Sequence, residues 1–358
     1  MESLKGLILS GGAGTRLRPI THTSAKQLVP VANKPVLFYG IEALVEAGVK
    51  EIGIIIAPET GEEIREAAGD GSQFGAEITY IVQDEPAGLA HAVLTAEEFI
   101  AGSPFVMYLG DNLLADGLTG LVASFRESEP DALILLTPVA DPSSYGVAEL
   151  DGDRIVRLVE KPKDPPSDLA LVGVYLFGPS IFAAARSLEP SWRGEYEITE
   201  AIQKLIEDGL KVQSEVVSGW WKDTGQLADM LEANRLVLEE IETRLEGDID
   251  ESSRVEGRVV VEPGATVKGS VVRGPAVIGA GATVEDAYVG PYTSLGENVS
   301  VARSEIEHSI VLAGSTVADL DARMEASLLG RDVKLTRSEG RPRTLQMLVG
   351  DRSEIKIV

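Results

Sequence analysis

Cysteine is absent from this chain of 358 residues, and histidine occurs only three times. The absence of cysteine excludes disulfide bonds, thiolate metal sites and thiol nucleophiles. It is also consistent with a reducing compartment, so we expect a cytoplasmic protein. With 44% hydrophobic residues, the chain is long and apolar enough for a sizeable core and two domains.

Long apolar runs and an excess of basic residues are also missing. No window of 18 residues is uninterruptedly apolar, and the N-terminus has no basic segment followed by a long apolar run. We therefore expect neither a membrane span nor a signal peptide. The formal charge of −25 argues against partners such as nucleic acid or anionic lipid.

The first two thirds of the chain alternates strand and helix patterns. A helical pattern begins at Pro35 and ends at Gly48, where a C-terminal cap belongs. Short apolar runs predict buried strands over residues 4–9, 52–57, 78–82 and 104–109. This alternation predicts an α/β domain with a Rossmann-like, mostly parallel sheet, which binds ligands beyond the carboxyl ends of its strands.

A long helical pattern precedes the point where helical periodicity stops and short apolar–glycine units begin. Apolar side chains at spacings of three and four predict a helix over residues 227–246, with Gly247 directly after it. The predicted apolar face consists of Leu227, Leu231, Asn234, Leu238, Ile241 and Leu245. We place the domain boundary here, so that residues 1–246 form the first domain and residues 247–358 the second.

Beyond Gly247, short apolar–glycine units recur every five or six residues. A six-residue repeat is typical of a parallel β-helix, whereas the turns of a β-sandwich, the alternative, recur about every 8–12 residues. The predicted interior residues are Val261, Val267, Val284, Val301, Ile306, Leu312 and Val317. The predicted corner residues are Ala265, Ala282, Thr293 and Ser315. Residues 345–358 alternate apolar and polar side chains, and we expect them to cap the open end of the stack or to form a contact surface.

A glycine-rich loop with Gly11, Gly12 and Gly14 directly follows the first predicted strand. Glycines let backbone N–H groups approach phosphate oxygens. A dinucleotide fingerprint is excluded because Leu17 stands where Gly or Ala is needed, and no Gly-Lys-Ser/Thr completes a P-loop. No acidic residue occurs between residues 3 and 41, and the same stretch carries Lys5, Arg16, Arg18, Lys26 and Lys34. This cationic island predicts a triphosphate site, and the alternative is a flexible turn with solvated basic residues.

Residues 11–19 resemble the signature of the sugar-1-phosphate nucleotidyltransferases, Gly-Gly-x-Gly-Thr-Arg-Leu-x-Pro. The Lys26-Gln27-Leu28-Val29-Pro30-Val31 segment, with Lys34-Pro35, resembles its second half. The chain is similar most of all to the long members, which use dTTP and glucose 1-phosphate and carry a left-handed parallel β-helix after the nucleotidyltransferase domain. The resemblance implies a homo-oligomeric, Mg²⁺-dependent enzyme that makes dTDP-glucose and pyrophosphate.

The resemblance also implies a nucleotide site. Its predicted binding residues are Gly11, Gly12, Ala13, Gly14, Thr15, Arg16, Gln83 and Gly88. The side-chain amide of Gln83 suits the imide edge of a pyrimidine, because it offers both a donor and an acceptor. The family commonly has Gln at the position of His91, so His91 receives no role. By the same resemblance, Arg16, Lys26 and Asp111 are predicted to be catalytic.

Two further motifs imply a metal site. Leu109-Gly110-Asp111-Asn112 matches the family's metal-binding L-G-D-N, and the segment from Trp220 to Gly225 resembles its W-x-D-T-G. Asp111 and Asp223 are therefore predicted to hold Mg²⁺. Two carboxylates suffice, because Mg²⁺ takes its other ligands from water and substrate phosphates.

The sugar-phosphate side is implied by four short motifs. Its predicted residues are Gly146, Glu160, Lys161, Val174 and Arg193. A carboxylate accepts hydrogen bonds from sugar hydroxyls, and two cations neutralise a phosphate dianion. The family usually has Glu-Leu-Glu-Ile-Thr-Asp after its Arg-Gly, whereas residues 195–200 read Glu-Tyr-Glu-Ile-Thr-Glu, so the choice of sugar stays open.

The implied reaction is an in-line displacement at the α-phosphorus. A sugar phosphate is already mostly a dianion at neutral pH, so the attack needs no general base. Three alternatives remain open. UTP or N-acetylglucosamine 1-phosphate could be the substrate; the β-helix could be an acyltransferase with His308 as base; or the protein could be a non-catalytic nucleotide sensor or scaffold. The last would have lost a metal carboxylate or Arg16, and all of these residues are present.

Overall fold

The computed structural model describes residues 3–12, 14–22, 24–337 and 349–356. Its contacts divide the chain into two compact units, which we call the α/β unit and the coil unit. The α/β unit comprises Met1–Ala13, Ser24–Leu28 and Val36–Asp223. The coil unit comprises Gly14–Thr23, Val29–Pro35 and Thr224–Val358. Two short N-terminal segments thus group with the C-terminal third, and the functional domain boundary at Gly247 stays a prediction.

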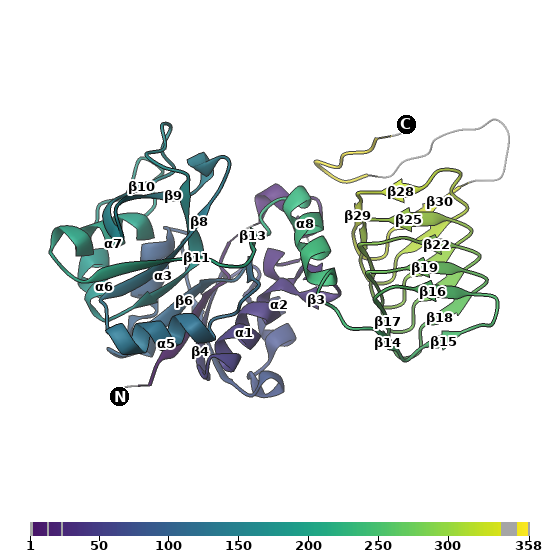
Figure 1. Ribbon diagram of the computed structural model, residues 1–358, viewed down its shortest axis with the longest axis horizontal. Coiled ribbons are helices and arrows are strands. Elements are labelled where there is room, and N and C mark those ends of the chain that lie inside the picture. The colour runs from purple at the N-terminus through teal and green to yellow at the C-terminus, as the bar shows by residue number, and fades with distance from the viewer. Residues whose placement is uncertain (1–2, 13, 23, 338–348, 357–358) are drawn as a thin grey trace. The chain divides into compact units, whose positions relative to one another are not determined.

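A nine-stranded mixed sheet forms the centre of the α/β unit (Figure 1), in the order β10-β9-β11-β6-β1-β4-β5, and β8 pairs with β11 while β12 pairs with β8. Strands β1, β4, β5 and β6 are parallel, whereas β11 runs antiparallel to β6, β8 and β9. The strands are β1 (Lys5–Leu9), β4 (Glu51–Ile56), β5 (Glu77–Val82), β6 (Phe105–Leu109), β8 (Ala132–Pro138), β9 (Gly146–Asp151), β10 (Arg154–Glu160), β11 (Leu169–Phe177) and β12 (Val212–Val216). The Rossmann-like fold class is confirmed, and the predicted strands correspond to β1, β4, β5 and β6.

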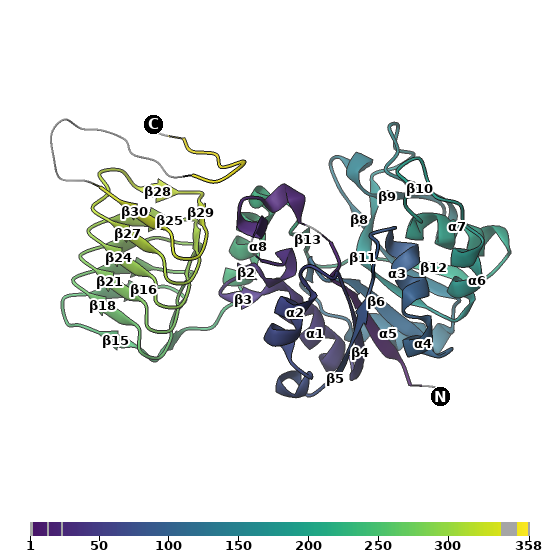
Figure 2. The same cartoon turned by 180° about the vertical axis from the view of Figure 1, so that it is seen from behind.

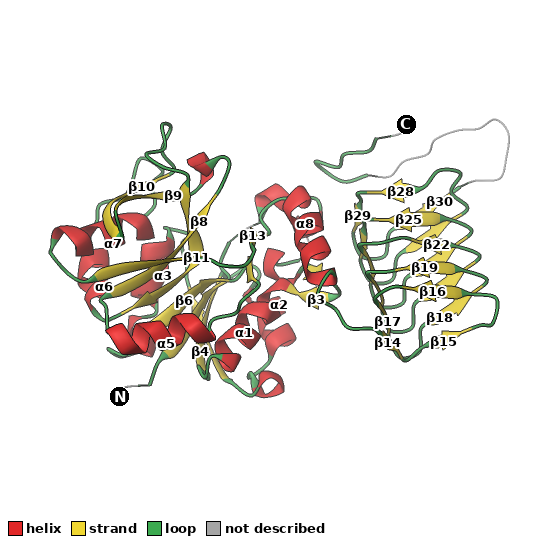
Figure 3. Ribbon diagram, in the orientation of Figure 1, coloured by secondary structure: helices red, strands yellow, loops and turns green. Residues whose placement is uncertain are grey.

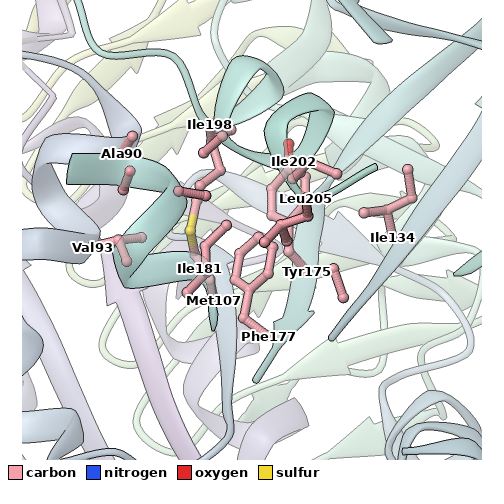
Figure 4. Packing of buried hydrophobic residues seen from close by; sticks show 14 of the residues in the cluster. Ala90, Val93, Met107, Ile134, Tyr175, Phe177, Ile181, Ile198, Ile202 and Leu205 are labelled. Atoms are coloured by element: carbon pink, nitrogen blue, oxygen red, sulfur yellow. The ribbon is translucent and has the colours of Figure 1, made fainter. Parts of the chain in front are cut away.

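Helices cover both faces of this sheet because its strands are apolar on both sides. In β6, Phe105 and Met107 pack with α3, α6 and α7, and Val106 and Tyr108 pack with α1, α2 and α5. Figure 4 shows the first of these clusters, where Met107, Tyr175 and Phe177 meet residues of the three helices. The helices are α1 (Val36–Glu46), α2 (Gly61–Ala68), α3 (Leu89–Thr95), α4 (Glu97–Ile100), α5 (Thr119–Ser128), α6 (Ser180–Arg186) and α7 (Ile198–Glu207). The helix predicted from Pro35 to Gly48 is α1.

The coil unit contains three parallel sheets of short strands, stacked coil on coil (Figure 2). Val261 pairs with Ile278, Leu295 with Val311 and Val311 with Leu329, so one coil spans 16 to 18 residues. The first sheet has β14 (Arg244–Leu245), β17 (Val259–Val261), β20 (Ala276–Ile278), β23 (Thr293–Leu295), β26 (Ile310–Val311) and β29 (Leu328–Leu329). The second has β15 (Asp248–Ile249), β18 (Thr266–Lys268), β21 (Thr283–Glu285), β24 (Ser300–Ala302), β27 (Thr316–Ala318) and β30 (Lys334–Thr336). The third has β16 (Arg254–Glu256), β19 (Val271–Arg273), β22 (Tyr288–Val289), β25 (Glu305–Glu307) and β28 (Met324–Glu325).

The predicted left-handed parallel β-helix is therefore confirmed, and the yellow strands of Figure 3 show its regular spacing. All the predicted interior and corner residues are buried, but Leu312 is not part of the interior cluster, in which the preceding Val311 packs instead. Two corners of successive coils place residues in the left-handed region, one at Gly264, Gly281, Asn298 and Gly314 and the other at Gly269, Asp286, Arg303 and Asp319. Glycine and asparagine tolerate this conformation. The apolar–glycine units need glycine for another reason, because a Cβ on Gly279 would lie 2.7 Å from Gly296 C and one on Gly290 would lie 2.6 Å from Glu307 Cβ.

The predicted helix over residues 227–246 is too long. Helix α8 spans Leu227–Leu238, and Leu245 already pairs with Val261 in the first sheet of the β-helix. The apolar spacing continues because Ile241 packs beside Leu238 as an irregular segment, so periodicity alone could not locate the end of the helix. Leu227 and Leu245, at the two ends of the predicted apolar face, are exposed.

A hairpin of β2 (Pro30–Val31) and β3 (Lys34–Pro35) also belongs to the coil unit, and a short antiparallel pair, β7 (Asn112–Leu114) with β13 (Trp221–Asp223), belongs to the α/β unit. The predicted C-terminal cap lies partly outside the described residues, and residues 349–356 form no strand or helix. Within the described ranges, no helix combines the length and apolarity needed to span a bilayer.

Candidate active site

Three segments of the predicted site meet at the carboxyl edge of the parallel strands. Ser10 follows β1, Gln83 follows β5 and Gly110 follows β6. Backbone hydrogen bonds join them to the sheet, from Ser10 N to Ile55 O at 2.8 Å, Gln83 N to Ile56 O at 2.9 Å and Gly110 N to Leu9 O at 3.0 Å. Ligands of open α/β sheets bind at this edge, so the fold itself positions the candidate site.

Lys26 and Asp111 form an ion pair at this edge, and both side chains are largely buried. Burial alone would raise the pKa of the Asp111 carboxyl. The ion pair with Lys26 and hydrogen bonds from Lys26 and Asn112 outweigh burial and hold that pKa below its usual value. A Cβ on Gly12 would lie 3.3 Å from Lys26 Cε, so the glycine loop runs directly beside this cation.

The second predicted metal carboxylate lies in the neighbouring strand pair. Asp223 of β13 is the register partner of Asn112 in β7, and such Cα atoms are about 4.5–5.5 Å apart. Asn112 Nδ2 in turn donates to Asp111 Oδ1 at 3.0 Å. Both residues are therefore neighbours of Asn112, Asp111 along the chain and Asp223 across the strand pair.

This donor set fits a hard divalent cation. Among the described residues, no three His, Cys, Asp or Glu side chains gather into a metal-holding group. A dedicated protein cage is therefore not built from these residues, whereas two carboxylates suit Mg²⁺, which keeps waters and substrate phosphates as its remaining ligands.

Two polar atoms near the glycine loop are buried without a partner. Ser10 Oγ and Gln27 Oε1 have no hydrogen bond among the described residues. Ser10 Oγ lies 2.6 Å from the position of a Cβ on Gly110, and Gln27 Nε2 lies 3.9 Å from that of a Cβ on Gly12. Buried polar groups normally find partners, so these atoms point to a polar ligand at the loop.

The predicted sugar-phosphate residues form a second cluster around Glu160. Its Oε2 accepts from Thr199 Oγ1 at 2.7 Å, and its Oε1 lies 3.6 Å from Arg193 Nη1 and 3.7 Å from Lys161 Nζ. Burial is the main reason that the pKa of Glu160 is raised, although Thr199 and the two cations act in the opposite direction. A Cβ on Gly146 would lie 2.8 Å from Thr199 Oγ1, so only glycine keeps the floor of this cluster open.

Arg193 makes further ion pairs, at 2.9 Å with Glu195 and at 3.2 Å with Glu197. The cluster thus combines two cations with several carboxylates, and an arriving phosphate would compete with carboxylates that already hold Arg193. Such a site can accept hydroxyl hydrogens and pair with an anion at the same time.

Trp221 connects the two clusters. Its Nε1 donates to Asn112 Oδ1 at 2.6 Å, and its ring meets Tyr145, the neighbour of Gly146, edge to face at 5.5 Å. A Cβ on Gly173 would lie 2.5 Å from Asn112 Oδ1, so β11 also approaches closely beside the predicted Val174. Val174 itself is buried and pairs with Tyr108 of β6.

Sequence reasoning gave no role to Asn112, Thr199 or Trp221. The available signal was their position within the matched motifs, because Asn112 completes L-G-D-N and Thr199 lies in the segment over residues 195–200. Trp221 begins the W-x-D-T-G motif, two residues before its carboxylate at Asp223. Their hydrogen bonds depend on strand pairing and could not be read from the sequence.

The predicted base-binding residues lie together as well. Gly88 has φ 104°, and a Cβ there would lie 2.5 Å from Tyr196 O, so the position requires glycine. Gln83 is buried, and its Oε1 lies 3.5 Å from the position of a Cβ on Gly11. The glycine loop and the base loop are therefore neighbours.

Three of the remaining signature residues, Gly14, Thr15 and Arg16, belong to the coil unit. Thr21 Oγ1 donates to Gly14 O at 2.7 Å, and Arg352 Nη1 donates to Thr15 O at 3.2 Å. Arg16 is exposed. Ala13 lies outside the described residues. The roles of these residues stay predictions.

Comparison with known proteins gives consistent results. A family model described as nucleotidyl transferase matches residues 5–240. The chain is 56% identical over 356 residues to a glucose-1-phosphate thymidylyltransferase from Streptomyces antibioticus, covering 99% of both chains. It is 49% identical over 358 residues to the low-salt glycan biosynthesis nucleotidyltransferase Agl11 from Haloferax volcanii, covering 99% of this chain and 100% of that one.

Among solved structures, a Bacillus anthracis protein provisionally named a glucose-1-phosphate thymidylyltransferase is 35% identical, with a TM-score of 0.64. The match covers 68% of this chain and 98% of that one, so the Bacillus protein lacks a counterpart to about a third of this chain. Nucleotidyl transferases of this kind use a divalent metal ion.

Proposed function

This chain belongs to the nucleotidyl transferase family, and on that premise we propose that it transfers a thymidylyl group from dTTP to glucose 1-phosphate. The products are dTDP-glucose and pyrophosphate. Near-full-length relatives with this activity in their names support the choice of substrates. The observation that carries the proposal is that the Lys26–Asp111 pair and Asp223 lie close to one another near the carboxyl edge of the sheet. Trp221 connects this group with the Glu160 cluster.

The glycine loop and its cations would receive the triphosphate. Backbone N–H groups of Gly11 and Gly12 would approach phosphate oxygens without hindrance from side chains of their own. Lys26 and Arg16 would balance the triphosphate charge. Asp111 and Asp223 would hold Mg²⁺, which when bound neutralises charge on the reacting phosphate oxygens.

The sugar phosphate would be held by the second cluster. Lys161 and Arg193 would pair with its phosphate, while Glu160, Gly146 and the backbone at Val174 would bind sugar hydroxyls. A phosphate oxygen then attacks the α-phosphorus and pyrophosphate leaves. Because the nucleophile is already anionic, catalysis consists of positioning and charge neutralisation.

The alternatives receive less support. His308 occupies a β-helix corner at φ 45°, its ring lies against Tyr292, and its Nε2 is buried, which does not suit an exposed acyltransferase base. UTP and N-acetylglucosamine 1-phosphate remain candidates, since a methyl group in an apolar pocket discriminates by only about 1–3 kcal/mol. The cytoplasmic location and the homo-oligomeric state stay predictions.

A substrate matrix tests the proposal. Four triphosphates (dTTP, UTP, ATP and GTP) are combined with glucose 1-phosphate, N-acetylglucosamine 1-phosphate and galactose 1-phosphate, and pyrophosphate release is measured with and without Mg²⁺. We expect the highest kcat/KM for dTTP with glucose 1-phosphate, partial use of UTP and no turnover without a divalent metal. Efficient turnover of ATP or GTP in preference to dTTP would contradict the assignment.

A further inference from the structure

The side chain of His91 contacts the residue proposed to read the base. His91 lies in the first turn of α3, and its Nδ1 is 2.9 Å from Gln83 Nε2. Its ring stacks on Tyr196 with centroids 6.4 Å apart and an interplanar angle of 28°. Tyr196 is in turn fixed by backbone hydrogen bonds from its N to Ala87 O at 2.8 Å and from Ala90 N to its O at 3.0 Å. The imidazole is therefore held in place from both sides.

The partners of Gln83 determine which way its amide points. Gln83 Nε2 also donates to Gly88 O at 3.4 Å, and a backbone carbonyl can only accept. The amide nitrogen must therefore face Gly88 and His91, so Nδ1 of His91 accepts and the imidazole carries its hydrogen on Nε2. In the reversed orientation the amide oxygen would face the Gly88 oxygen, and the hydrogen bond to Gly88 would be lost.

This arrangement leaves Gln83 Oε1 to act as an acceptor beside the glycine loop, 3.5 Å from the position of a Cβ on Gly11. Thymine and uracil carry a hydrogen on N3 and can donate to such an oxygen. Cytosine has an unprotonated N3, which would place a lone pair against it. A buried acceptor without a donor is unfavourable, so the fixed amide discriminates between these bases.

We propose that His91 is a positioning residue that fixes the amide orientation of Gln83 and thereby selects triphosphates with an imide base over cytosine nucleotides. The inference rests on the proposed function in one respect, namely that the base is read by Gln83. It gives a role to a residue that differs from the Gln common in the family. A Gln at this position would also offer an oxygen acceptor to Gln83 Nε2.

Two variants separate the hydrogen bond from the packing. His91→Phe keeps a ring against Tyr196 but removes the acceptor, and His91→Gln keeps an acceptor but removes the ring. For each protein, kcat/KM is measured for dTTP and for dCTP with glucose 1-phosphate, and binding of both nucleotides is measured by calorimetry without sugar phosphate. Circular dichroism and the thermal midpoint check that each variant is folded.

We expect His91→Phe to lower the dTTP/dCTP ratio about tenfold, mainly through a higher KM and Kd for dTTP, with kcat retained. His91→Gln is expected to keep the ratio within about threefold of the unsubstituted protein. An unchanged ratio in folded His91→Phe overturns the inference, as does an equal loss in both variants. If His91→Phe does not fold, His91→Gln decides the question. A dTTP/dCTP ratio lowered about tenfold in His91→Gln then overturns the inference, and a ratio within about threefold of the unsubstituted protein supports it.

The binding measurement keeps the two proposals distinguishable. If the unsubstituted protein binds dTTP but does not turn it over with any sugar 1-phosphate, the proposed reaction is wrong. The role of His91 is then still decided by the calorimetric dTTP/dCTP ratio of the variants.

Discussion

The hydrophobic cores of the two units consist of different types of side chains. The α/β unit buries large side chains such as Tyr108, Phe105 and Phe177 between a sheet and two layers of helices. The coil unit buries a column of Val, Ile and Leu side chains, with small residues such as Ala282 and Ser315 at its corners. The first architecture ends its strands in irregular loops at one edge, whereas the second returns to the same corner about every 17 residues. Variable loops accommodate chemistry, and a repeating coil leaves little room for it.

The contrast is incomplete because the chain interleaves the two units. Helix α8 presents Asn234, fully buried, to both the β2–β3 hairpin and the β-helix. Asn234 Oδ1 accepts from Ala32 N at 2.9 Å and from Ser294 Oγ at 2.7 Å, and its Nδ2 donates to Tyr292 O at 3.0 Å. The β2–β3 hairpin, which follows Lys26 in the chain, is thus packed against the C-terminal third, although no predicted catalytic residue lies beyond Gly247.

The largest effect is expected where chemistry is concentrated. Asp111→Asn and Asp223→Asn each remove a proposed metal carboxylate, and we expect turnover to fall by about 10²-fold or more at saturating Mg²⁺. Pyrophosphate release measures this. The matched control is Asp319→Asn in the β-helix, which removes an exposed partner of Arg303 and is expected to leave turnover unchanged. Near-normal turnover in either site variant would exclude that residue from the metal site.

The next effect concerns the buried amide that joins hairpin and coil. Asn234→Ala leaves Ala32 N, Ser294 Oγ and Tyr292 O without their partner, and we expect a loss of about 2–4 kcal/mol in the free energy of unfolding. Urea denaturation followed by circular dichroism measures it. Asn298→Gly, at an exposed corner with φ 54°, is the control and should change stability by less than about 0.5 kcal/mol. Equal stability of the two variants would show that the amide contributes little.

Removing the coils tests how far the units depend on each other. A chain ending at Gly247 loses Leu295 O, which accepts from Asn33 Nδ2 at 2.6 Å, and loses the partners of α8. We expect detectable transfer, a KM for the triphosphate raised about tenfold, and a changed oligomeric state or stability. Light scattering and pyrophosphate release compare both proteins, with circular dichroism to confirm folding. A truncated protein that is folded and has the same oligomeric state as the full chain, yet is wholly inactive, would show that the coils contribute directly to the active site.

The smallest effect is expected at the contact between the C-terminal segment and the signature. Arg352→Ala removes one exposed hydrogen bond to Thr15 O, so the KM for dTTP should rise by about threefold or less. Arg331→Ala, in the last described coil, provides a control of the same side-chain change. A tenfold or larger rise specific to Arg352 would mean that the C-terminal segment controls the nucleotide loop.

The fold class and the residues proposed for the site could be predicted from sequence patterns. Alternating apolar runs predicted β1, β4, β5 and β6 because buried parallel strands are continuous in hydrophobicity. The valine and glycine repeat predicted the β-helix because each coil has the same interior to fill. The matched motifs named Lys26 and Asp111, which the structure places in one ion pair.

Which polar residues act together became clear from the packing of the folded chain. Asn234 appeared as one position on an apolar helix face, and its burial with three partners depends on segments up to 202 residues away. The end of α8 at Leu238 was set by sheet pairing of Leu245, which competes with a helical spacing that continues in the sequence. His91 received no role until strand β5 and helix α3 brought it to Gln83. Periodicity and motifs report local preference, whereas hydrogen-bond partners distant in sequence are fixed by how the chain packs.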